Sequence, residues 1–455
     1  MLGGMVAYAV CFLCCYPRIF AIVDEDAYLT QALLFRTGHL SYTNSPIPPP
    51  HMTVNMAGRL VSKYPPGNAL FLVPFTALGW RGVFVSGLLL ALVGTGLCAL
   101  TLRQLAPAAD PDWALLFLYY PAVTIYSRTV MSDLLAAVAA LAGFYLLIRD
   151  KGWLLLSGAC LGFACLVRYS TVVLVPALLL SALILRHRTG TSRQLFLLIP
   201  GLALFLGMAL AYNRYAFGGP LQFPFFLTGN FSPSFIPRNL LYYSTTLLAW
   251  YPLMLLAPLA LPARLRFLLG LPPLAILALY APFSYLPQDS TLPGRLVLGT
   301  RYLLPAIPFL VLGFVIGMVR WGIGRWQKGV VKSGLLVLAF LGSTALQVRH
   351  SEYLNRQDFY RRLVYDLVPR SALLFCNRDV AELVSYAWGW RDCRPLANLD
   401  SLNLTTVHRP VFWAWLSKDS NRILPTPHRA LRSWSLVFET DRPYRFELYR
   451  LMPAQ

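Results

Sequence analysis

The sequence predicts an all-α polytopic membrane protein that ends in a small, soluble α+β domain. Two observations support this fold class. Hydrophobic residues make up 57% of the 455 residues and charged residues only 13%, which is far from the balance of soluble globular proteins. Apolar runs long enough to cross a bilayer as helices, about 17 to 25 residues each, recur from residue 2 to residue 348 and then stop.

About 11 transmembrane helices are predicted, and the count depends mainly on the apolar stretch from 153 to 186. As one helix this stretch would be about 50 Å long, so we interpret it as a hairpin of two spans. The short loops rich in Lys and Arg then share one side, which the positive-inside rule makes cytoplasmic. In this topology the amino terminus is cytoplasmic and the carboxy-terminal domain faces outward. With one helix more or fewer, the carboxy-terminal domain would lie in the cytoplasm. The predicted spans are residues 2–22, 82–103, 113–131, 133–149, 153–168, 170–186, 195–215, 243–262, 266–284, 301–319 and 331–348.

Two domains are expected: a transmembrane domain over residues 1–348, with an outer loop at 23–81, and an extracytoplasmic domain over 349–455. In the second, apolar and polar residues alternate in "SALLFCNRDVAELVSYAW" and "RSWSLVFETDRPYRFELYRL", a pattern typical of strands with a helix between them. We expect this domain to end in a hairpin. Its Cys376 and Cys393 can form a disulfide if the domain lies outside the cytoplasm.

Five acidic residues face outward before residue 349 in this topology. Asp24, Glu25 and Asp26 open "DEDAYLTQALLFRTGHL", whose apolar spacing predicts an amphipathic helix at the interface with carboxylates at its positive amino-terminal end. Asp133 follows the third span, and Asp289 lies in a later loop. Carboxylates at the rim of a helical bundle are costly to desolvate unless cations or metals pair with them, which makes them candidate site residues. The alternative is an acid hydrated at the headgroups, and it is favoured for Asp26 and Asp289.

The order of several motifs resembles the GT-C glycosyltransferases, specifically the glycosyltransferase family 39 type that includes protein O-mannosyltransferases and the aminoarabinose transferases of lipid A. The resemblance covers roughly residues 20 to 320 and implies GT-C-like outer juxtamembrane helices, one of them opened by Pro66. The matching motifs are "DEDAY", like DE-x-x-Y; "KYPPG", a basic residue before a proline pair; "YSRTVMSD"; "LSGACLGFACLVR"; "NRYAFGGPL", like N-x-x-x-F-G-x-P; and "GTRYLLPAIPFL", like R-Y-x-x-P-x-x-P.

This resemblance implies that a sugar attached to a polyprenyl phosphate is passed, on the outer face, to an acceptor hydroxyl or similar nucleophile with inversion at the anomeric carbon. A carboxylate within hydrogen-bond reach can take the proton of the attacking hydroxyl. By resemblance to DE-x-x-Y, Asp24 is the general base, Glu25 orients it or holds the acceptor, and Tyr28 is a substrate-binding candidate. Asp26 occupies a variable position of the motif and is interpreted as a helix cap.

The leaving phosphate calls for fixed cations at the outer rim, because its negative charge grows in the transition state. The basic residues that match family motifs are Lys63, Arg168 and Arg301, and Tyr302 beside the last is a further substrate-binding candidate. A snorkelling arginine is the alternative for Arg168, and an interfacial anchor is the alternative for Arg301. Asp133 is the third catalytic candidate, able to pair with one of these cations or to help bind a divalent metal.

A divalent metal is a possible cofactor, but the sequence assigns it no ligands. The outward histidines before residue 349 are His39 and His51, for which a solvated loop position is the favoured alternative. The expected partners are a polyprenyl-phosphate sugar donor, a glycan, lipid or protein acceptor, and membrane lipid, whose anionic headgroups suit a net charge of +20. Nucleic acid is not expected on the outer face.

The expected location is a bacterial inner (plasma) membrane, with the site and the carboxy-terminal domain on the periplasmic or exterior side. A transporter or flippase of a charged lipid or solute is the main alternative function. Transporters usually carry polar groups near the bilayer midplane and internal repeats, whereas the charges here cluster at one face. An oligosaccharide polymerase or ligase with a similar outer site is the alternative among enzymes.

Overall fold

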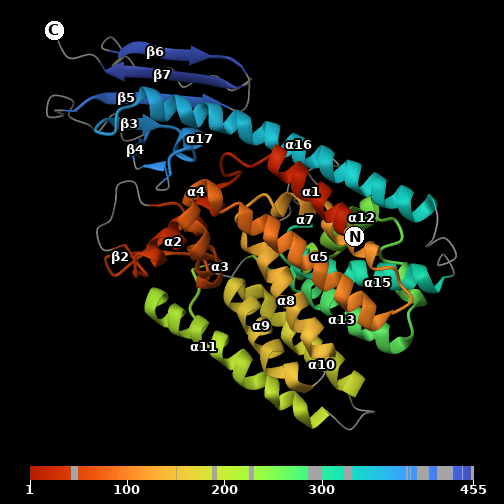
Figure 1. Cartoon of the computed structure of the whole chain (residues 1–455). Helices are drawn as coiled ribbons and strands as arrows, with labels where there is room; N and C mark the ends of the chain where they lie inside the picture. The colour runs from red at the N-terminus through yellow and green to blue at the C-terminus, as the bar shows by residue number, and fades with distance from the viewer. Residues whose placement is uncertain are drawn as a thin grey trace. The chain divides into compact units, whose positions relative to one another are not determined.

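A computed structural model describes the chain in two compact units (Figure 1). Unit 1 comprises Met1–Tyr16 and Lys63–His350, and unit 2 comprises Pro17–Ser62 and Ser351–Gln455. The structure describes residues 1–42, 50–149, 151–186, 192–224, 230–284, 300–321, 330–385, 388–389, 391–396, 409–417, 434–442 and 444–451.

Unit 1 is helical, as predicted. Three of the described helices are long and apolar enough to cross a membrane: Val85–Leu105, Gln194–Phe217 and Ala263–Tyr280. Shorter apolar helices accompany them, and eleven stays a prediction for the number of spans. The α-helices of the unit are α1 (Leu2–Cys14), α3 (Pro66–Leu72), α4 (Gly79–Gly82), α5 (Val85–Leu105), α6 (Leu115–Leu118), α7 (Pro121–Tyr126), α8 (Ser132–Ile148), α9 (Leu154–Val167), α10 (Leu174–Arg186), α11 (Leu198–Phe217), α12 (Ile236–Trp250), α13 (Ala263–Tyr280), α15 (Ile307–Arg320) and the first part of α16 (Val330–Leu367).

Prolines explain where several predicted helices differ from the observed ones. The helix expected over 2–22 ends at Cys14, three residues before Pro17. The one expected over 113–131 is split, because Pro121 cannot continue a helix and instead opens α7 at its first turn. The one expected over 243–262 is replaced by α12, which ends where Tyr251, the residue before Pro252, is extended (φ −122°, ψ 91°).

The last predicted span, 331–348, belongs to a much longer helix. The 38 residues of α16 run from Val330 to Leu367, so polar turns continue the helix beyond the apolar stretch. The helix ends just before Pro369, and no proline occurs within it. The predicted span ends at residue 348, where the hydrophobicity ends, but the polar residues that follow also favour a helix and contain no helix-breaking proline before Pro369.

The glycines of the "LSGACLGFACLVR" motif allow α9 to pack closely against α11. A Cβ atom on Gly158 would lie 2.0 Å from the carbonyl oxygen of Leu198, and one on Gly162 would lie 2.9 Å from that of Leu202. Small residues four apart are the usual means by which membrane helices bring their backbones together. The motif therefore has a packing function, which fixes the position of the residue that follows α9.

Unit 2 combines the acidic helix with a sheet domain. It contains α2 (Val23–Arg36), a hairpin of β1 (Thr53–Met56) and β2 (Arg59–Ser62), the second part of α16, α17 (Arg378–Ala381), and the strands β3 (Leu373–Cys376), β4 (Asp392–Pro395), β5 (Val411–Ser417), β6 (Trp434–Thr440) and β7 (Arg445–Leu451). The five last strands lie in the order β4-β3-β5-β7-β6, with β3 parallel to β4 and β5 and with β7 antiparallel to its neighbours. The predicted α+β domain and its terminal hairpin are confirmed.

The hairpin β1–β2 was not predicted, since residues 50–62 were interpreted as part of the outer loop at 23–81. Its turn has positive φ at both Ala57 (51°) and Gly58 (80°), a backbone that favours Asn-Gly or Asp-Gly. The Asn55 side chain accepts a hydrogen bond from the Gly58 amide and stabilises the turn. Ala-Gly lacks the usual sequence signal, so the hairpin was missed.

The core of unit 2 lies between the second part of α16 and one face of the sheet, and Figure 1 shows this part of the helix alongside the strands. Tyr360 and Val364 of α16 pack with Leu374, Phe412 and Phe446 from three strands, and all of these side chains are buried. Burial of large apolar side chains is the main source of stability for such a domain.

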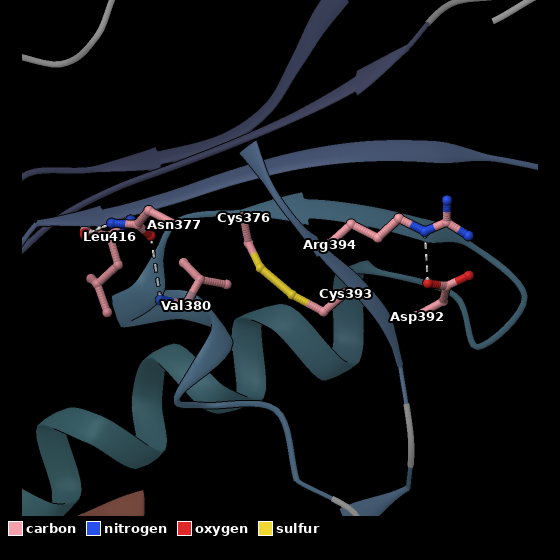
Figure 2. The surroundings of a disulfide bond; sticks show 7 residues. All are labelled: Cys376, Asn377, Val380, Asp392, Cys393, Arg394 and Leu416. Carbon is pink, nitrogen blue, oxygen red and sulfur yellow. Dashed lines mark hydrogen bonds and ion pairs between the residues drawn. A yellow bond between two sulfur atoms is a disulfide. The ribbon is translucent and has the colours of Figure 1, made fainter. Parts of the chain in front are cut away.

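Cys376 and Cys393 form a disulfide between β3 and β4 (Figure 2). Both cysteines are buried in the core, at 2% and 3% exposure. Next to the bond, the Asn377 side chain accepts from the Val380 and Leu416 amides and donates to the Leu416 carbonyl. The disulfide therefore joins β3 to β4, and the Asn377 side chain joins the end of β3 to α17 and β5.

Replacing both cysteines with alanine is expected to destabilise unit 2 by about 3 kcal/mol, because the bond closes a loop of 17 residues in the unfolded chain. The measurement is denaturant-dependent proteolysis of the carboxy-terminal domain, with and without reductant. Reductant should destabilise the wild type to the level of the variant, whereas replacing the exposed free Cys14 should have no effect. Equal proteolysis of wild type and double variant would contradict the expectation.

Candidate active site

A buried carboxylate and two arginines form a compact charged cluster in unit 1. Asp133 lies in the first turn of α8 and is fully buried. One of its oxygens accepts a 2.6 Å hydrogen bond from Nη1 of Arg168, and the other lies 3.6 Å from Nε of Arg301. The arginine side chains are 15% and 19% exposed, so both reach the surface of the unit. With one carboxylate between two guanidinium groups, the cluster carries one surplus positive charge.

Two stacked tyrosine rings, Tyr302 and Tyr280, lie beside the arginines. The guanidinium carbons of Arg168 and Arg301 lie 5.6 and 5.8 Å from the ring centre of Tyr302, within the range of cation–π attraction. Tyr302 stacks on Tyr280 with ring centres 4.8 Å apart, and the Tyr280 hydroxyl accepts a 3.4 Å hydrogen bond from Arg168. Charged hydrogen bonds and flat ring faces in one place are chemically suited to a phosphate with an attached sugar.

The "NRYAFGGPL" motif holds the turn that carries Arg168. Arg168 caps the carboxyl end of α9, and the hydroxyl of the next residue, Tyr169, donates to the Asn213 side chain. The Asn213 amide in turn donates to the Pro220 carbonyl at 3.1 Å. Two motifs that are far apart in the sequence therefore fix the backbone immediately after Arg168.

The "KYPPG" motif ends beside the backbone that carries the same cluster. As predicted, Pro66 opens α3. The Asn68 side chain donates a 2.9 Å hydrogen bond to the Val130 carbonyl, three residues before Asp133. A Cβ atom on Gly67 would lie 2.5 Å from the backbone nitrogen of Val167, the residue before Arg168, so only glycine permits this contact. Lys63, half-buried, precedes Gly67 by four residues.

The acidic motif lies in unit 2, at the start of α2. Asp24 is half-buried, whereas Glu25 and Tyr28 are buried. The Glu25 carboxylate accepts a 2.8 Å hydrogen bond from the Ala21 amide. Of the three adjacent carboxylates, Asp24 is thus the most accessible to a substrate.

Asp26 has a different environment from the one expected. It is 4% exposed, and its carboxylate accepts hydrogen bonds from Ser385 Oγ and, at 2.7 Å, from His51 Nδ1. Its interpretation as a helix cap is therefore wrong, because the amino-terminal cap position of α2 is Ile22. His51, which lies just before β1 in the sequence, is thus a hydrogen-bonding partner of the Asp26 carboxylate.

The Asp26 carboxylate also changes the proton affinity of His51. Burial disfavours the imidazolium, but the hydrogen bond and charge of Asp26, with smaller contributions from the Ala381 backbone and Glu382, outweigh burial and raise the pKa of His51 above its ordinary value.

This raised pKa predicts that unit 2 loses stability at alkaline pH. A histidine whose pKa is higher in the folded state stabilises that state. The stabilisation is complete at pH values below the pKa of the unfolded chain, about 6.5. It disappears as the pH rises through the pKa of the folded state. Amide hydrogen exchange of α2 between pH 6 and 9, corrected for the intrinsic rate, should show the loss. His51→Gln should flatten the dependence, and His39→Gln, at an exposed position, should not. The same pH dependence in wild type and His51→Gln would contradict the prediction.

The predicted site residues divide between the two units. Unit 1 brings Asp133, Arg168, Arg301 and Tyr302 into one cluster, with Lys63 at the start of the segment that leads to it. Unit 2 contains Asp24, Glu25 and Tyr28 on one helix. Asp289 lies outside the described residues.

Sequence reasoning missed Tyr280, Ser385 and Arg128, and it noted Asn213 only as the first residue of the "NRYAFGGPL" motif. Arg128 is fully buried, donates to the Cys15 carbonyl and to His350 Nδ1, and lies over the Phe12 ring. It joins the end of α1 to α7 and α16, a structural role. An arginine inside an apolar predicted span was the available signal, whereas Tyr280 and Ser385 carry no charge and gave none.

Metal ligation stays a prediction. Within the described ranges, no group of three or more His, Cys, Asp and Glu side chains is arranged to hold a metal ion. His39 bonds to Thr37, and the Cys11, Cys14 and Cys15 thiols form no disulfide within the described part of the chain.

Comparison with solved structures identifies the fold. The chain is similar to ArnT from Cupriavidus metallidurans in the apo state, with a TM-score of 0.66 and 15% identity over 99% of this chain and 98% of that chain. It is also similar to ArnT from the same organism bound to undecaprenyl phosphate, with a TM-score of 0.65 and 13% identity over 100% of this chain and 98% of that one. No protein-family model and no curated protein matches the sequence. The chain therefore shares the fold of these ArnT structures, as the resemblance in the order of motifs led us to expect.

Proposed function

We propose that this protein is a membrane glycosyltransferase that moves a sugar from a polyprenyl-phosphate donor to an acceptor on the outer face of the membrane, with inversion. The observation that carries the proposal is the Asp133–Arg168–Arg301 cluster, a surplus positive charge at the end of a helical bundle. The fold supports it, because one of the ArnT structures that share it binds undecaprenyl phosphate.

In the proposed reaction the two arginines bind the phosphate of the donor. A sugar phosphodiester carries one negative charge, and the polyprenyl phosphate that leaves carries nearly two. Because the guanidinium groups are fixed by Asp133 and Tyr302, they need no reorganisation as this charge develops. Lys63 is proposed as a further cation for the phosphate, and Tyr302 as a contact for the sugar.

Asp24 is the proposed general base. The acceptor oxygen attacks the anomeric carbon and forms the new glycosidic bond while Asp24 takes its proton. The bond between the anomeric carbon and the phosphate oxygen breaks on the opposite side, and its electron pair leaves with the phosphate. Glu25 is proposed to orient this end of the helix, in keeping with its hydrogen bond to the Ala21 amide, and Tyr28 to contact the substrate.

The disulfide supports an outward-facing carboxy-terminal domain in a bacterial inner membrane. Stable disulfides form in oxidising compartments and are rare in the cytosol, so the Cys376–Cys393 bond suits a periplasmic location. With a cytoplasmic amino terminus, this location requires an odd number of spans, as in the predicted eleven.

The experiment that tests the proposal is transfer from a panel of radiolabelled polyprenyl-phosphate sugars into total membrane acceptors, using purified protein in liposomes and protein-free liposomes as the control. Label that moves into glycan, lipid or protein only with the protein present would establish the activity and identify the donor. If no donor is consumed, the glycosyltransferase proposal fails, and flux of charged solutes and lipids through the same liposomes would test the transporter or flippase alternative.

A further inference from the structure

We propose that the sheet domain positions the acidic helix for transfer through Asp26, whose carboxylate accepts from Ser385 and His51 outside the helix as well as, at 3.4 Å, from Thr30 within it. This inference rests on the proposed function and extends it: the third acid of "DEDAY" is a positioning residue, and the sheet domain contributes to catalysis by holding α2. All residues involved lie in unit 2.

The first argument is the direction of adjacent side chains. Successive residues of an α-helix project about 100° apart, so Asp24 and Asp26 face different surroundings. Asp24 is half-buried, whereas Asp26 is buried against Ser385, which is itself 1% exposed. Fixing Asp26 therefore fixes the rotation of α2 and the direction in which Asp24 points.

The second argument is that the domain fixes Ser385 in turn. The Tyr365 hydroxyl of α16 donates to the Ser385 carbonyl at 3.2 Å and accepts from the Ser385 amide at 3.1 Å. Arg391 lies 4.6 Å from the centre of the Tyr365 ring and donates to the Tyr365 carbonyl. The backbone of Ser385, whose hydroxyl donates to Asp26, is thus held by Tyr365 of α16.

The third argument is a second attachment just before α2. The Phe20 ring stacks on the Trp388 ring with centres 5.3 Å apart, and the Tyr353 hydroxyl of α16 donates to the Ala21 carbonyl. Asp24 lies between this attachment and Asp26. A carboxylate held on both sides keeps its position within the narrow tolerance that general-base catalysis requires.

The fourth argument is energetic. A buried carboxylate is costly unless it is paired and hydrogen-bonded, and Asp26 obtains both from His51 and Ser385. A purely apolar contact would dock α2 without this cost. The polar contact instead specifies one rotation of the helix, because hydrogen bonds depend on direction.

The test uses the full-length protein in liposomes and compares wild type with Ser385→Ala, Ser385→Thr and the exposed control His39→Gln. Ser385→Ala is expected to speed amide exchange in residues 20–36 and to lower kcat about 10- to 100-fold, with little change in KM for the donor. Ser385→Thr keeps a hydroxyl and should restore most of both. His39→Gln should resemble wild type.

Three results would overturn the inference. Unchanged exchange of α2 in Ser385→Ala would show that Ser385 does not hold the helix, whether or not the protein is a glycosyltransferase. Faster exchange with an unchanged kcat would show that the contact does not position the base. A rise in KM alone would assign the contact to substrate binding. Wild-type protein that transfers no sugar would instead overturn the proposed function, and exchange of α2 would still decide whether Ser385 holds the helix.

Discussion

Arg168→Gln is expected to lower kcat for transfer about 10²- to 10³-fold, the usual effect of removing one fixed donor to a developing oxyanion. Arg168 makes the shortest contact in the cluster, 2.6 Å to Asp133, and also contacts Tyr280 and Tyr302. Glutamine retains hydrogen-bond donors but no charge, so the loss reports the charge. The measurement is steady-state transfer from the donor found in the panel.

A structural explanation of that loss can be separated from a catalytic one. Removing one partner of a buried ion pair often destabilises a protein by about 3 to 5 kcal/mol, although Arg301 still lies near Asp133 in this variant. The double variant Arg168→Gln/Asp133→Asn removes one charge of each sign and keeps the net charge of the wild-type cluster. If it regains wild-type activity, the role of Arg168 is structural, whereas continued inactivity of both variants with normal folding assigns a function in transfer to the cluster as a whole. Arg238→Gln, at an exposed arginine of the same unit, is the matched control.

Asp24→Asn is expected to reduce transfer at least 10²-fold while donor binding stays within about twofold of wild type, because general-base catalysis typically contributes 10² to 10⁴. Asparagine has the size of aspartate and cannot accept the proton of the acceptor. The measurement is turnover together with equilibrium binding of the polyprenyl-phosphate donor. Asp379→Asn, in α17 of the same unit, serves as the control.

A fully active Asp24→Asn variant would contradict the assignment of the base. Loss of donor binding in this variant would contradict it too, because the proposal places the phosphate at the arginines and not at the carboxylate. Glu25→Gln offers a useful contrast. Glu25 is buried and bonded to the Ala21 amide, so its replacement should affect the stability of α2 as well as turnover.

Much of the candidate site could be predicted because charge is rare in this chain. Only 13% of the residues in the chain are charged. A single arginine at the end of an apolar segment, such as Arg168, or a single carboxylate, such as Asp133, is therefore easy to recognise. The sequence therefore predicted the residues of the cluster, but not that one carboxylate lies between both arginines. That arrangement depends on the close packing of α9 on α11 and of α3 on α9, which separate parts of the sequence determine together.

The uncharged and distant contributors could not be predicted. Tyr280 is an ordinary residue of an apolar helix until the fold places it beside Arg168. Asn213 begins a quoted motif, but the motif did not indicate its hydrogen bond with Tyr169. Asp26 was given the wrong role because its partner Ser385 follows it by 359 residues, beyond the reach of any local pattern. The bounds of the helices were least predictable where proline or a continuous polar helix, rather than hydrophobicity, decided them, as at Cys14 and along α16.

The position of Asp133 between the two arginines also bears on the release of the spent carrier. Groups that stabilise a phosphate dianion in the transition state hold the dianionic product as well, so such a site tends to be inhibited by its own product. Asp133 lowers the net charge of the arginine pair from two to one. It therefore weakens the binding of the dianionic product without removing either guanidinium group. Within the proposed reaction, this carboxylate sets the affinity for the sugar-bearing donor against the rate at which polyprenyl phosphate is released. The rate of repeated turnover depends on both.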